Sequence, residues 1–267
     1  MTTVEDTLAH DWQVWHAARE ETLREPHGWL SLTALHWLTA EPTAYLSVPG
    51  RWHADDAGVH ITATPVDGLH TDGALIKGTV TLTPREGAPG LPVTFDDKLV
   101  EVVLRTGRHG IRLRDPQSPT LTGFRGVPAF PVDHRWVVPA TFEQYAVPRR
   151  IVGAAVVDGL EHHHSVRGVL RFAVDGGTYG LLAFDGGPGR LSVLFRDATS
   201  GVTTHGGVRS VVVADPGGSG PAIIDFNRAV NLPCAFTDYG TCPLPPRENV
   251  LPLAVEAGER KPHPVGR

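Results

Sequence analysis

From Tyr45 onward, the sequence consists of short runs of Val, Ile, Leu and Thr that are separated by Gly, Asp and Pro. Short β-branched runs between such breakers are typical of antiparallel strands joined by tight turns. The chain holds 30 glycines and 23 prolines. Aromatic and β-branched residues stay common between them, so the breakers indicate turns and not disorder. The pattern predicts a mainly β fold, an antiparallel barrel or sandwich, and does not choose between the two.

Ten strands are expected, at residues 58–63, 75–82, 99–105, 109–114, 150–157, 167–174, 179–184, 190–196, 208–214 and 222–226. Two turns carry hairpin signals, Asp175-Gly176-Gly177 and the glycine-rich segment 185–189. The second half of the chain is therefore expected to form a meander. The proline-rich segment 116–139 is expected to be a long connection over one end of the barrel.

The first 25 residues are expected to form a helix that Pro26 ends. Thr3 is the expected N-cap, with Asp6 three positions further on. Apolar side chains recur along one stripe, at Val4, Leu8, Trp12, Trp15 and Leu23. The apolar run 29–38 predicts a second, short and well-buried helix.

Length and charge narrow the class of protein. The 267 residues are expected to form a single domain, with a helical segment, residues 1–40, packed on a β-rich domain, residues 41–267. The formal net charge of −5 argues against a nucleic acid partner, since phosphate binding depends on clustered Lys and Arg. No apolar run has the about 18 residues that span a bilayer, and the N-terminus lacks the pattern of a secretory signal. We expect a soluble, cytoplasmic protein without a membrane partner; the oligomeric state stays open.

Both cysteines and a dense set of carboxylates and amides lie between Asp225 and Glu259. Five prolines from Pro233 to Pro252 prevent a long helix, so a proline-rich C-terminal coil is expected. Irregular backbone on a rigid scaffold often carries binding groups. This coil is therefore the expected site.

Several motifs resemble the DUF1684 family, a set of bacterial and archaeal proteins of unknown activity. The C-terminal ones are Asp-Phe-Asn at 225–227, Asn-x-Pro-Cys-Ala at 231–235, Thr-Cys-Pro-Leu-Pro-Pro at 241–246, Glu-Asn at 248–249 and Ala-Gly-Glu at 257–259. Others are Gly-Trp-Leu-Ser-Leu at 28–32, Trp-Leu at 37–38, Asp-x-Thr-Ser-Gly at 197–201 and Thr-x-x-Gly-x-Arg at 204–209. The resemblance covers most of the chain and implies no reaction.

Two interpretations of the Asp-x-Thr-Ser-Gly turn stay open. The hydroxyls of Thr199 and Ser200 and the glycine amides would hold an anion, with His205 beside them and Arg209 as a bidentate clamp for carboxylate or phosphate. Alternatively, Asp197 caps its own turn and the segment is structural.

The sequence contains no nucleophile elbow, P-loop or dinucleotide fingerprint. Asp225 and Asn227 lie two positions apart at a strand end, so both side chains can face one cavity. Asp225 is the candidate general base, and Asn227 or Asn231 would polarise a carbonyl. The coil is expected to bring five residues toward the turn, namely Asn231, Cys234, Cys242, Glu248 and Asn249.

Arg112 and Arg114 project from the same face of a predicted strand. On a buried face, each needs a carboxylate or an anionic ligand, because an unpaired buried charge is very costly. The expected partners are Asp225, Glu248 or Glu256. On the outer face of the sheet, the two arginines would carry no function.

Cys234 and Cys242 are separated by seven residues, unlike the close Cys-x-x-Cys pairs of zinc ribbons and thioredoxin-like sites. We expect no metal. The weak alternative is zinc held by both thiolates, His205 and a carboxylate, although the family resemblance implies tyrosine at position 205. Packing of two small buried residues and a disulfide or redox role also stay open.

Two other histidine positions are interpreted as structural. The tract His162-His163-His164 cannot face one ion, since side chains alternate along a strand, and it is expected in an exposed turn. His36 is expected to be a core residue of the second helix.

The leading hypothesis is a pocket near the C-terminal motif that binds or converts a small polar or anionic ligand, with the cofactor and any enzyme activity left open. The alternative is a non-enzymatic protein whose polar motif is a structural network that supports a protein–protein interface. An unpaired Arg209 or Asp225 in a cavity would favour the ligand, whereas a fully paired cluster would favour the network.

Overall fold

The computed structural model describes residues 4–263, which divide into two compact units. The C-terminal unit comprises residues 4–21 and 125–263, and the N-terminal unit comprises residues 22–124. Within this range the chain is mainly β, with three antiparallel sheets and two α-helices. Compactness alone does not decide whether the units unfold together, so the single domain stays a prediction.

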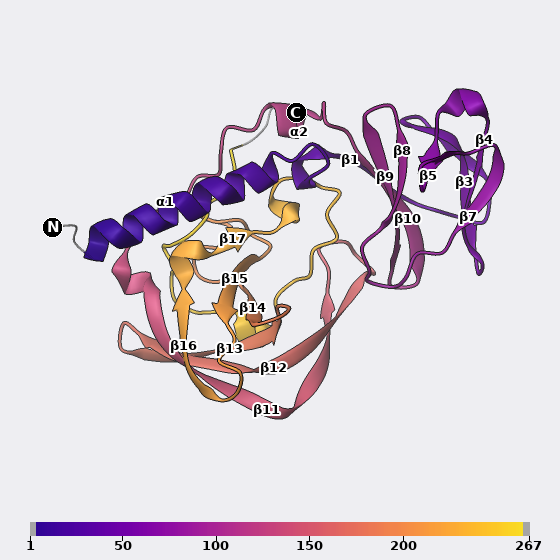
Figure 1. Cartoon of the computed structure of the whole chain (residues 1–267). Coiled ribbons are helices and arrows are strands. Elements are labelled where there is room, and N and C mark those ends of the chain that lie inside the picture. The colour runs from indigo at the N-terminus through magenta and orange to yellow at the C-terminus, as the bar shows by residue number, and fades with distance from the viewer. Residues whose placement is uncertain (1–3, 264–267) are drawn as a thin grey trace. The chain divides into compact units, whose positions relative to one another are not determined.

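A seven-stranded sheet forms the C-terminal unit, in the order β16-β11-β12-β13-β14-β15-β17 (Figure 1). Its strands are β11 (Val137–Ala154), β12 (Glu161–Val174), β13 (Gly177–Asp185), β14 (Arg190–Phe195), β15 (Arg209–Ala214), β16 (Gly220–Asp225) and β17 (Val230–Asn231). The strands from β11 to β15 are neighbours in chain order, which confirms the predicted meander. In the described residues the hydrogen-bonded ladder stays open, with β16 and β17 at its ends.

Both predicted hairpins are present. Asp175 and Gly176 have positive φ values of 50° and 75°, the conformation of a two-residue turn that matches strand twist. This turn joins β12 to β13, and the segment 185–189 joins β13 to β14.

The main core of the C-terminal unit lies on one face of this sheet. Its largest side chains include Trp136, Phe142, Phe195 and Phe226, all nearly inaccessible to solvent. Phe226 packs edge-on against both Trp136 and Phe195. Four consecutive residues of β13 are buried, because a second apolar cluster around Phe184 covers its other face.

Helix α1 (Val4–Leu23) confirms the predicted N-terminal helix. It lies along the segment that leads into β17 (Figure 1), where the indole N–H of Trp12 donates to the carbonyl of Asn227 at 2.7 Å. Arg19 donates to the carbonyl of Asn231 at 3.0 Å. The predicted N-cap, Thr3, lies outside the described residues.

Two sheets form the N-terminal unit, in the orders β1-β10-β9-β8-β5-β6 and β2-β3-β4-β7. The strands are β1 (Leu32–Trp37), β2 (Thr43–Tyr45), β3 (Val48–Asp55), β4 (Gly58–Ala63), β5 (His70–Thr71), β6 (Ala74–Leu75), β7 (Gly78–Leu82), β8 (Leu91–Phe95), β9 (Lys98–Arg105) and β10 (Arg108–Arg114). Both sheets contribute to one core, which includes Trp52, Ile61, Val102 and Ile111.

The prediction of a second helix over residues 29–38 is wrong. Trp29–Ser31 form a single 3₁₀ turn, and the residues after it form β1, which pairs with β10. Leu32 and Ala34 are buried while the residue between them is half-buried, which is the period of a strand. A short apolar run fits either element, and the pairing with β10 decides between them.

All ten predicted strands overlap observed ones. Missing from the prediction are β1, β2, β3, β5, β8, β17 and the first part of β11. The segment 116–139 contains helix α2 (Pro119–Thr122) and enters β11. The remaining 3₁₀ turns are Pro65–Asp67, His134–Trp136, Phe226–Arg228, Pro233–Ala235 and Arg247–Asn249. None of the helices described here is both long and apolar enough to span a membrane.

Candidate functional site

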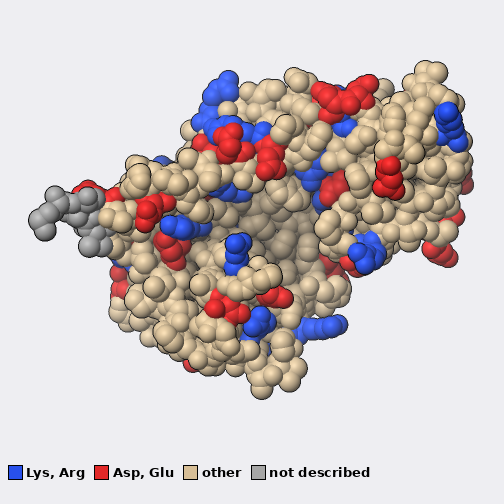
Figure 2. All heavy atoms as spheres, in the orientation of Figure 1, with Lys and Arg blue, Asp and Glu red and all other residues tan. Residues whose placement is uncertain are grey.

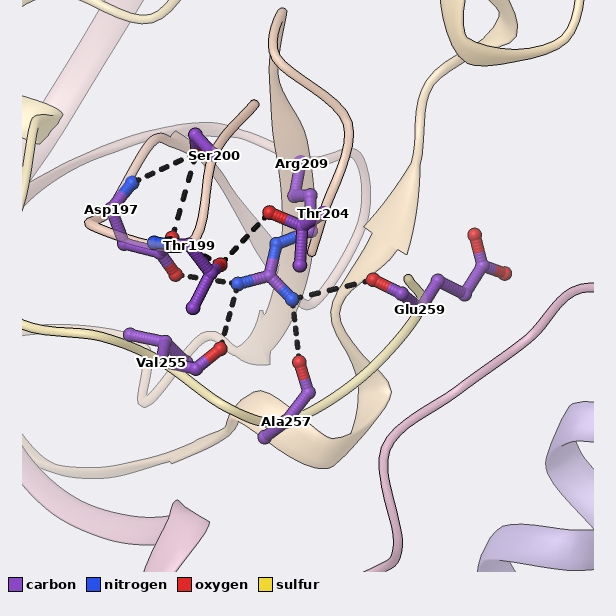
Figure 3. A network of polar contacts seen from close by, with 8 residues as sticks. All are labelled: Asp197, Thr199, Ser200, Thr204, Arg209, Val255, Ala257 and Glu259. Atoms are coloured by element: carbon purple, nitrogen blue, oxygen red, sulfur yellow. Dashed lines mark hydrogen bonds and ion pairs between the residues drawn. The ribbon is translucent and has the colours of Figure 1, made fainter. Parts of the chain in front are cut away.

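Arg209 lies at the centre of a buried polar network (Figure 3). Its side chain is 1% exposed. Nη2 donates to Oδ2 of Asp197 at 2.5 Å and to the carbonyl of Val255 at 3.0 Å. Nη1 donates to the carbonyls of Ala257, at 2.5 Å, and Glu259, at 3.4 Å. Each terminal nitrogen therefore makes two hydrogen bonds within the protein.

The charge of Arg209 is compensated inside the network. Burial lowers the pKa of the guanidinium, and the carboxylate of Asp197 acts in the opposite direction. Arginine stays protonated in proteins, so Asp197 balances a full positive charge in a place without water access. The ring of Phe195, centred 5.0 Å from the guanidinium carbon, lies against it.

The turn that presents Asp197 is closed by its own polar groups. Oδ1 of Asp197 accepts from the backbone N–H of Thr199 at 2.8 Å and from its hydroxyl at 2.5 Å. The hydroxyls of Thr199 and Thr204 lie 2.8 Å apart, and Ser200 Oγ accepts from the backbone N–H of Asp197 at 3.1 Å. The backbone amides of residues 200–204 donate to carbonyls of the same turn. The groups expected to hold an anion are thus engaged within the turn.

Gly258 lets the Ala-Gly-Glu motif reach this network. Its φ is 75°, and a Cβ at this position would lie 2.5 Å from the carbonyl oxygen of Ala229. The backbone N–H of Glu259 donates to that same carbonyl at 2.8 Å. Glycine alone combines the left-handed conformation with so close an approach.

We expect Gly258→Ala to lower the free energy of unfolding by at least about 2 kcal/mol, since a left-handed conformation costs about 1 kcal/mol for alanine and the clash adds to it. The matched control is Gly217→Ala, where φ is 80° and nothing lies within 4 Å of the added Cβ. Urea unfolding of both variants measures the difference. Equal losses would mean that the close approach at Gly258 has no energetic weight.

The carboxylate of Glu259 points away from Arg209 (Figure 3) and connects β17 to α1. Oε2 accepts from the backbone N–H of Asn231 at 2.6 Å, and Oε1 accepts from Nε of Arg19 at 3.2 Å. Burial raises the pKa of Glu259, and Arg19 opposes that effect. Asn231 donates its side-chain amide to the carbonyl of Arg260 at 2.8 Å. The predicted ligand residue Asn231 therefore fixes the backbone of the C-terminal segment.

Asp225 and Asn227 hydrogen-bond each other, and no cavity is described beside them, in contrast to the prediction that both face one cavity. Asn227 is 1% exposed; it accepts from the N–H of Asp133 and donates to its carbonyl, each at 3.0 Å. Oδ1 of Asp225 accepts from the side-chain amide of Asn227 at 3.0 Å and from its backbone N–H at 3.1 Å. Oδ2 lies 3.2 Å from Nε of Arg228. Asp225 is thus the cap of the 3₁₀ turn that follows β16.

The side-chain amide of Asn249 takes the place of backbone hydrogen bonds between β13 and β14 where these two strands separate. These strands pair at only two positions, near Phe184 and Asp185. Further along, Oδ1 of Asn249 accepts from the N–H of Leu182 at 2.7 Å. Its Nδ2 donates to the carbonyls of Leu182, at 3.0 Å, and Leu194, at 2.8 Å. The side chain is fully buried, so it satisfies backbone groups that water cannot reach.

Arg112 and Arg114 lie side by side on a buried stretch of β10. Their carboxylate is Glu101 of β9, at 3.7 Å from Arg112 and 2.9 Å from Arg114, and not one of the three predicted acids. Arg114 also donates to the carbonyl of Gly28 at 2.7 Å. The ring of Trp29 lies 5.9 Å from the Arg112 guanidinium carbon and 4.9 Å from that of Arg114. Glu101 was missed because the strand pattern does not show which acid lies opposite an arginine.

Glu248 is exposed, and its carboxylate lies 3.8 Å from Arg149. This predicted ligand residue lies on the surface, in contrast to the neighbouring Asn249.

The placement of the histidine tract in an exposed turn is wrong. All three histidines belong to β12, because β11 continues far enough to pair with them. His162 and His164 share a half-buried face with ring centroids 5.9 Å apart, and His163 points to the other side. His36, in β1, stacks on Tyr45 at 4.4 Å.

His205 and the two cysteines come together in the structure. Nε2 of His205 lies 3.7 Å from Sγ of Cys234, whose backbone N–H donates to Sγ of Cys242 at 3.3 Å. Among the described residues, no group of three or more His, Cys, Asp or Glu side chains is arranged to hold a metal ion.

One hollow lies away from the C-terminal motif. A shallow hollow in the N-terminal unit is lined by Trp37, Asp55, Asp56 and Arg108, among others, and by none of the predicted site residues. On the face shown in Figure 2, basic and acidic side chains are interspersed. That distribution differs from the continuous basic stripe of a phosphate-binding surface.

Comparisons with known proteins find one matching family and a similar solved structure. A model of the DUF1684 family, described as proteins of unknown function, matches residues 122–260. The motifs at 28–32 and 37–38 lie outside this range. The chain is also similar to an uncharacterised protein from Haloarcula marismortui, solved by NMR in solution, at 32% identity over 52% of this chain and 78% of that chain, with a TM-score of 0.45. No curated protein matches.

Proposed function

This chain belongs to the DUF1684 family of proteins of unknown function, and we propose that its C-terminal signature is a structural network and not a catalytic centre. The single observation that supports this most is the pairing of Arg209, whose terminal nitrogens donate only to groups of the protein itself. A guanidinium used in this way has no terminal N–H left for a substrate anion. The network would keep the sheet rigid, so that the protein acts as a non-enzymatic scaffold for a protein partner.

The other signature residues support the same proposal. Asn231, Asn227 and Asn249 each hydrogen-bond backbone groups of segments distant in sequence. Buried amides placed against backbone groups stabilise one chain path, whereas catalytic groups usually leave an atom open to the substrate. Oδ1 of Asn231 and Nε of Arg209 have no hydrogen-bond partner among the described residues, but both atoms are buried.

Variants of Asp225 test this proposal. We expect Asp225→Ala to lower the free energy of unfolding by about 1–2 kcal/mol, the usual cost of losing a cap, and Asp225→Asn to lose less because it keeps an acceptor at Oδ1. Thermal or urea unfolding of both variants gives the values. A catalytic base usually lowers the stability of the folded protein, so its removal leaves stability unchanged or raises it. An unchanged or raised stability in both variants would therefore contradict the structural role.

A small polar or anionic ligand is the second candidate. Arg112 and Arg114 favour it, because two guanidinium groups lie on one buried face of β10 against Trp29. A carboxylate or phosphate suits such a pair. In native mass spectrometry, a retained anion that is lost on unfolding and in Arg114→Gln would favour this candidate.

Two finer points belong to the same proposal. The shared core of two sheets in the N-terminal unit supports a sandwich there and not a barrel. We place the protein in the cytoplasm, because two cysteines in 267 residues do not form the disulfide scaffold of a secreted domain.

A further inference from the structure

Cys234 and Cys242 lie in contact although they are eight positions apart in the chain. Neither of them is part of a disulfide. The backbone N–H of Cys234 donates to Sγ of Cys242 at 3.3 Å. Cys234 is half-buried, whereas Cys242 is 6% exposed. Cys234 is therefore the more accessible residue of the two.

Gly207 and Gly240 have no side chains, and the imidazole of His205 and the two sulfurs lie in the space that side chains at these positions would occupy. A Cβ at Gly207 would lie 2.8 Å from Nε2 of His205 and 3.7 Å from Sγ of Cys234. A Cβ at Gly240 would lie 3.2 Å from the backbone nitrogen of Cys234 and 3.6 Å from Sγ of Cys242. The imidazole and both sulfurs thus fill space that any larger residue would take.

We propose that Cys234 and Cys242 form a redox-sensitive dithiol, which a hydroperoxide converts into an intramolecular disulfide with His205 as the base. The arrangement involves no member of the Arg209 network, so it is independent of the structural role proposed above.

The reaction balances in two steps. His205 takes the proton of the Cys234 thiol, and the thiolate attacks the terminal oxygen of the hydroperoxide. The O–O bond breaks, the proton passes to the leaving alkoxide, and Cys234 becomes a sulfenic acid. Sγ of Cys242 then attacks that sulfur, the S–O bond breaks, and water leaves. The two thiols lose two electrons in all, and the hydroperoxide becomes an alcohol.

His205 is close enough for the first step, because its Nε2 lies 3.7 Å from Sγ of Cys234. Burial lowers its pKa, and the cations Lys261 and Arg196 lower it further, so the imidazole is neutral near pH 7. Its interaction with the Cys242 side chain and its burial raise the pKa of the Cys234 thiol, so the resting thiol is protonated and needs a base.

The test uses the reduced full-length chain and hydrogen peroxide. We expect intact-mass analysis to show the loss of two hydrogens, about 2 Da, and digestion to yield one peptide pair joined through Cys234 and Cys242. The disulfide should raise Tm by about 5 °C, because it restricts the unfolded chain. Two intact thiols after treatment, or a bond only between chains, would overturn the proposal.

Variants assign the roles. Cys242→Ser should accumulate a sulfenic acid at Cys234 that dimedone traps, and Cys234→Ser should oxidise at least about tenfold more slowly. His205→Gln should slow oxidation about tenfold at pH 7. In the wild type the rate should fall as acid protonates His205, and the variant should lack this inflection. Equal rates in both cysteine variants would contradict the assigned order, and an unchanged inflection in His205→Gln would exclude His205 as the base.

Discussion

Replacement of Asp197 by alanine is expected to lower the free energy of unfolding by about 3–5 kcal/mol, because it leaves the guanidinium of Arg209 buried without a counter-charge. Both side chains are at most 1% exposed, so water cannot take over the role of the carboxylate. The variant also loses the acceptor that closes the turn at Thr199. The two losses act together, which makes this one of the most destabilising single changes we expect.

A double-mutant cycle separates the energy of the Asp197–Arg209 ion pair from the energy of the hydrogen bonds that close the turn. Arg209→Met alone should also be strongly destabilising, because three carbonyls lose their donor. In the double variant Asp197→Ala/Arg209→Met, the total loss should be smaller than the sum of the single losses by about 2–3 kcal/mol. Asp158→Ala, at an exposed position, is the control and should stay within about 0.5 kcal/mol of wild type. Additive losses in urea unfolding would contradict the coupling.

The sequence predicts local elements of this chain well where turn chemistry is strong. Asp175-Gly176 marks a hairpin because both residues accept positive φ, and the meander follows from short strands joined in this way. The sequence misleads where a strand contains proline. β11 carries Pro139 and Pro148, residues that usually exclude a strand. Pro148 lies where the register shifts between Gln144 and Arg149, and Pro139 precedes the first residue of β11 that pairs with β12.

The sequence motifs indicate which residues belong to the polar cluster, but they do not indicate which of these residues pair with each other. Asp197 and Arg209 are twelve positions apart, and Arg19 and Glu259 are separated by 240, so no local pattern relates either pair. Arg19 lies on a helix among other charged residues and carries no signal of its own. The sequence thus indicates which residues need partners, whereas the fold decides whether a partner is a ligand or the protein's own backbone.

The other large effect is expected for Asn249→Asp, which keeps the size of the side chain and removes both N–H donors. An ionised aspartate would place an oxygen against the carbonyls of Leu182 and Leu194, where Nδ2 of Asn249 now donates. We expect a loss of about 3 kcal/mol or more at pH 7.5, since buried acceptors would face each other unpaired.

This loss should depend on pH in a defined direction. Burial and the two carbonyls disfavour the charged form, so the folded-state pKa of the new carboxyl must lie above its unfolded value of about 3.9. Below the unfolded pKa the acid is neutral and its O–H replaces one lost donor, so the loss relative to wild type is smallest there. It grows as pH rises from the unfolded toward the folded pKa. Urea unfolding at pH 4 and pH 7.5 measures it, with the exposed Gln13→Glu as the matched amide-to-acid control. A loss that is equal at both pH values would show that the carboxyl is not held against these carbonyls.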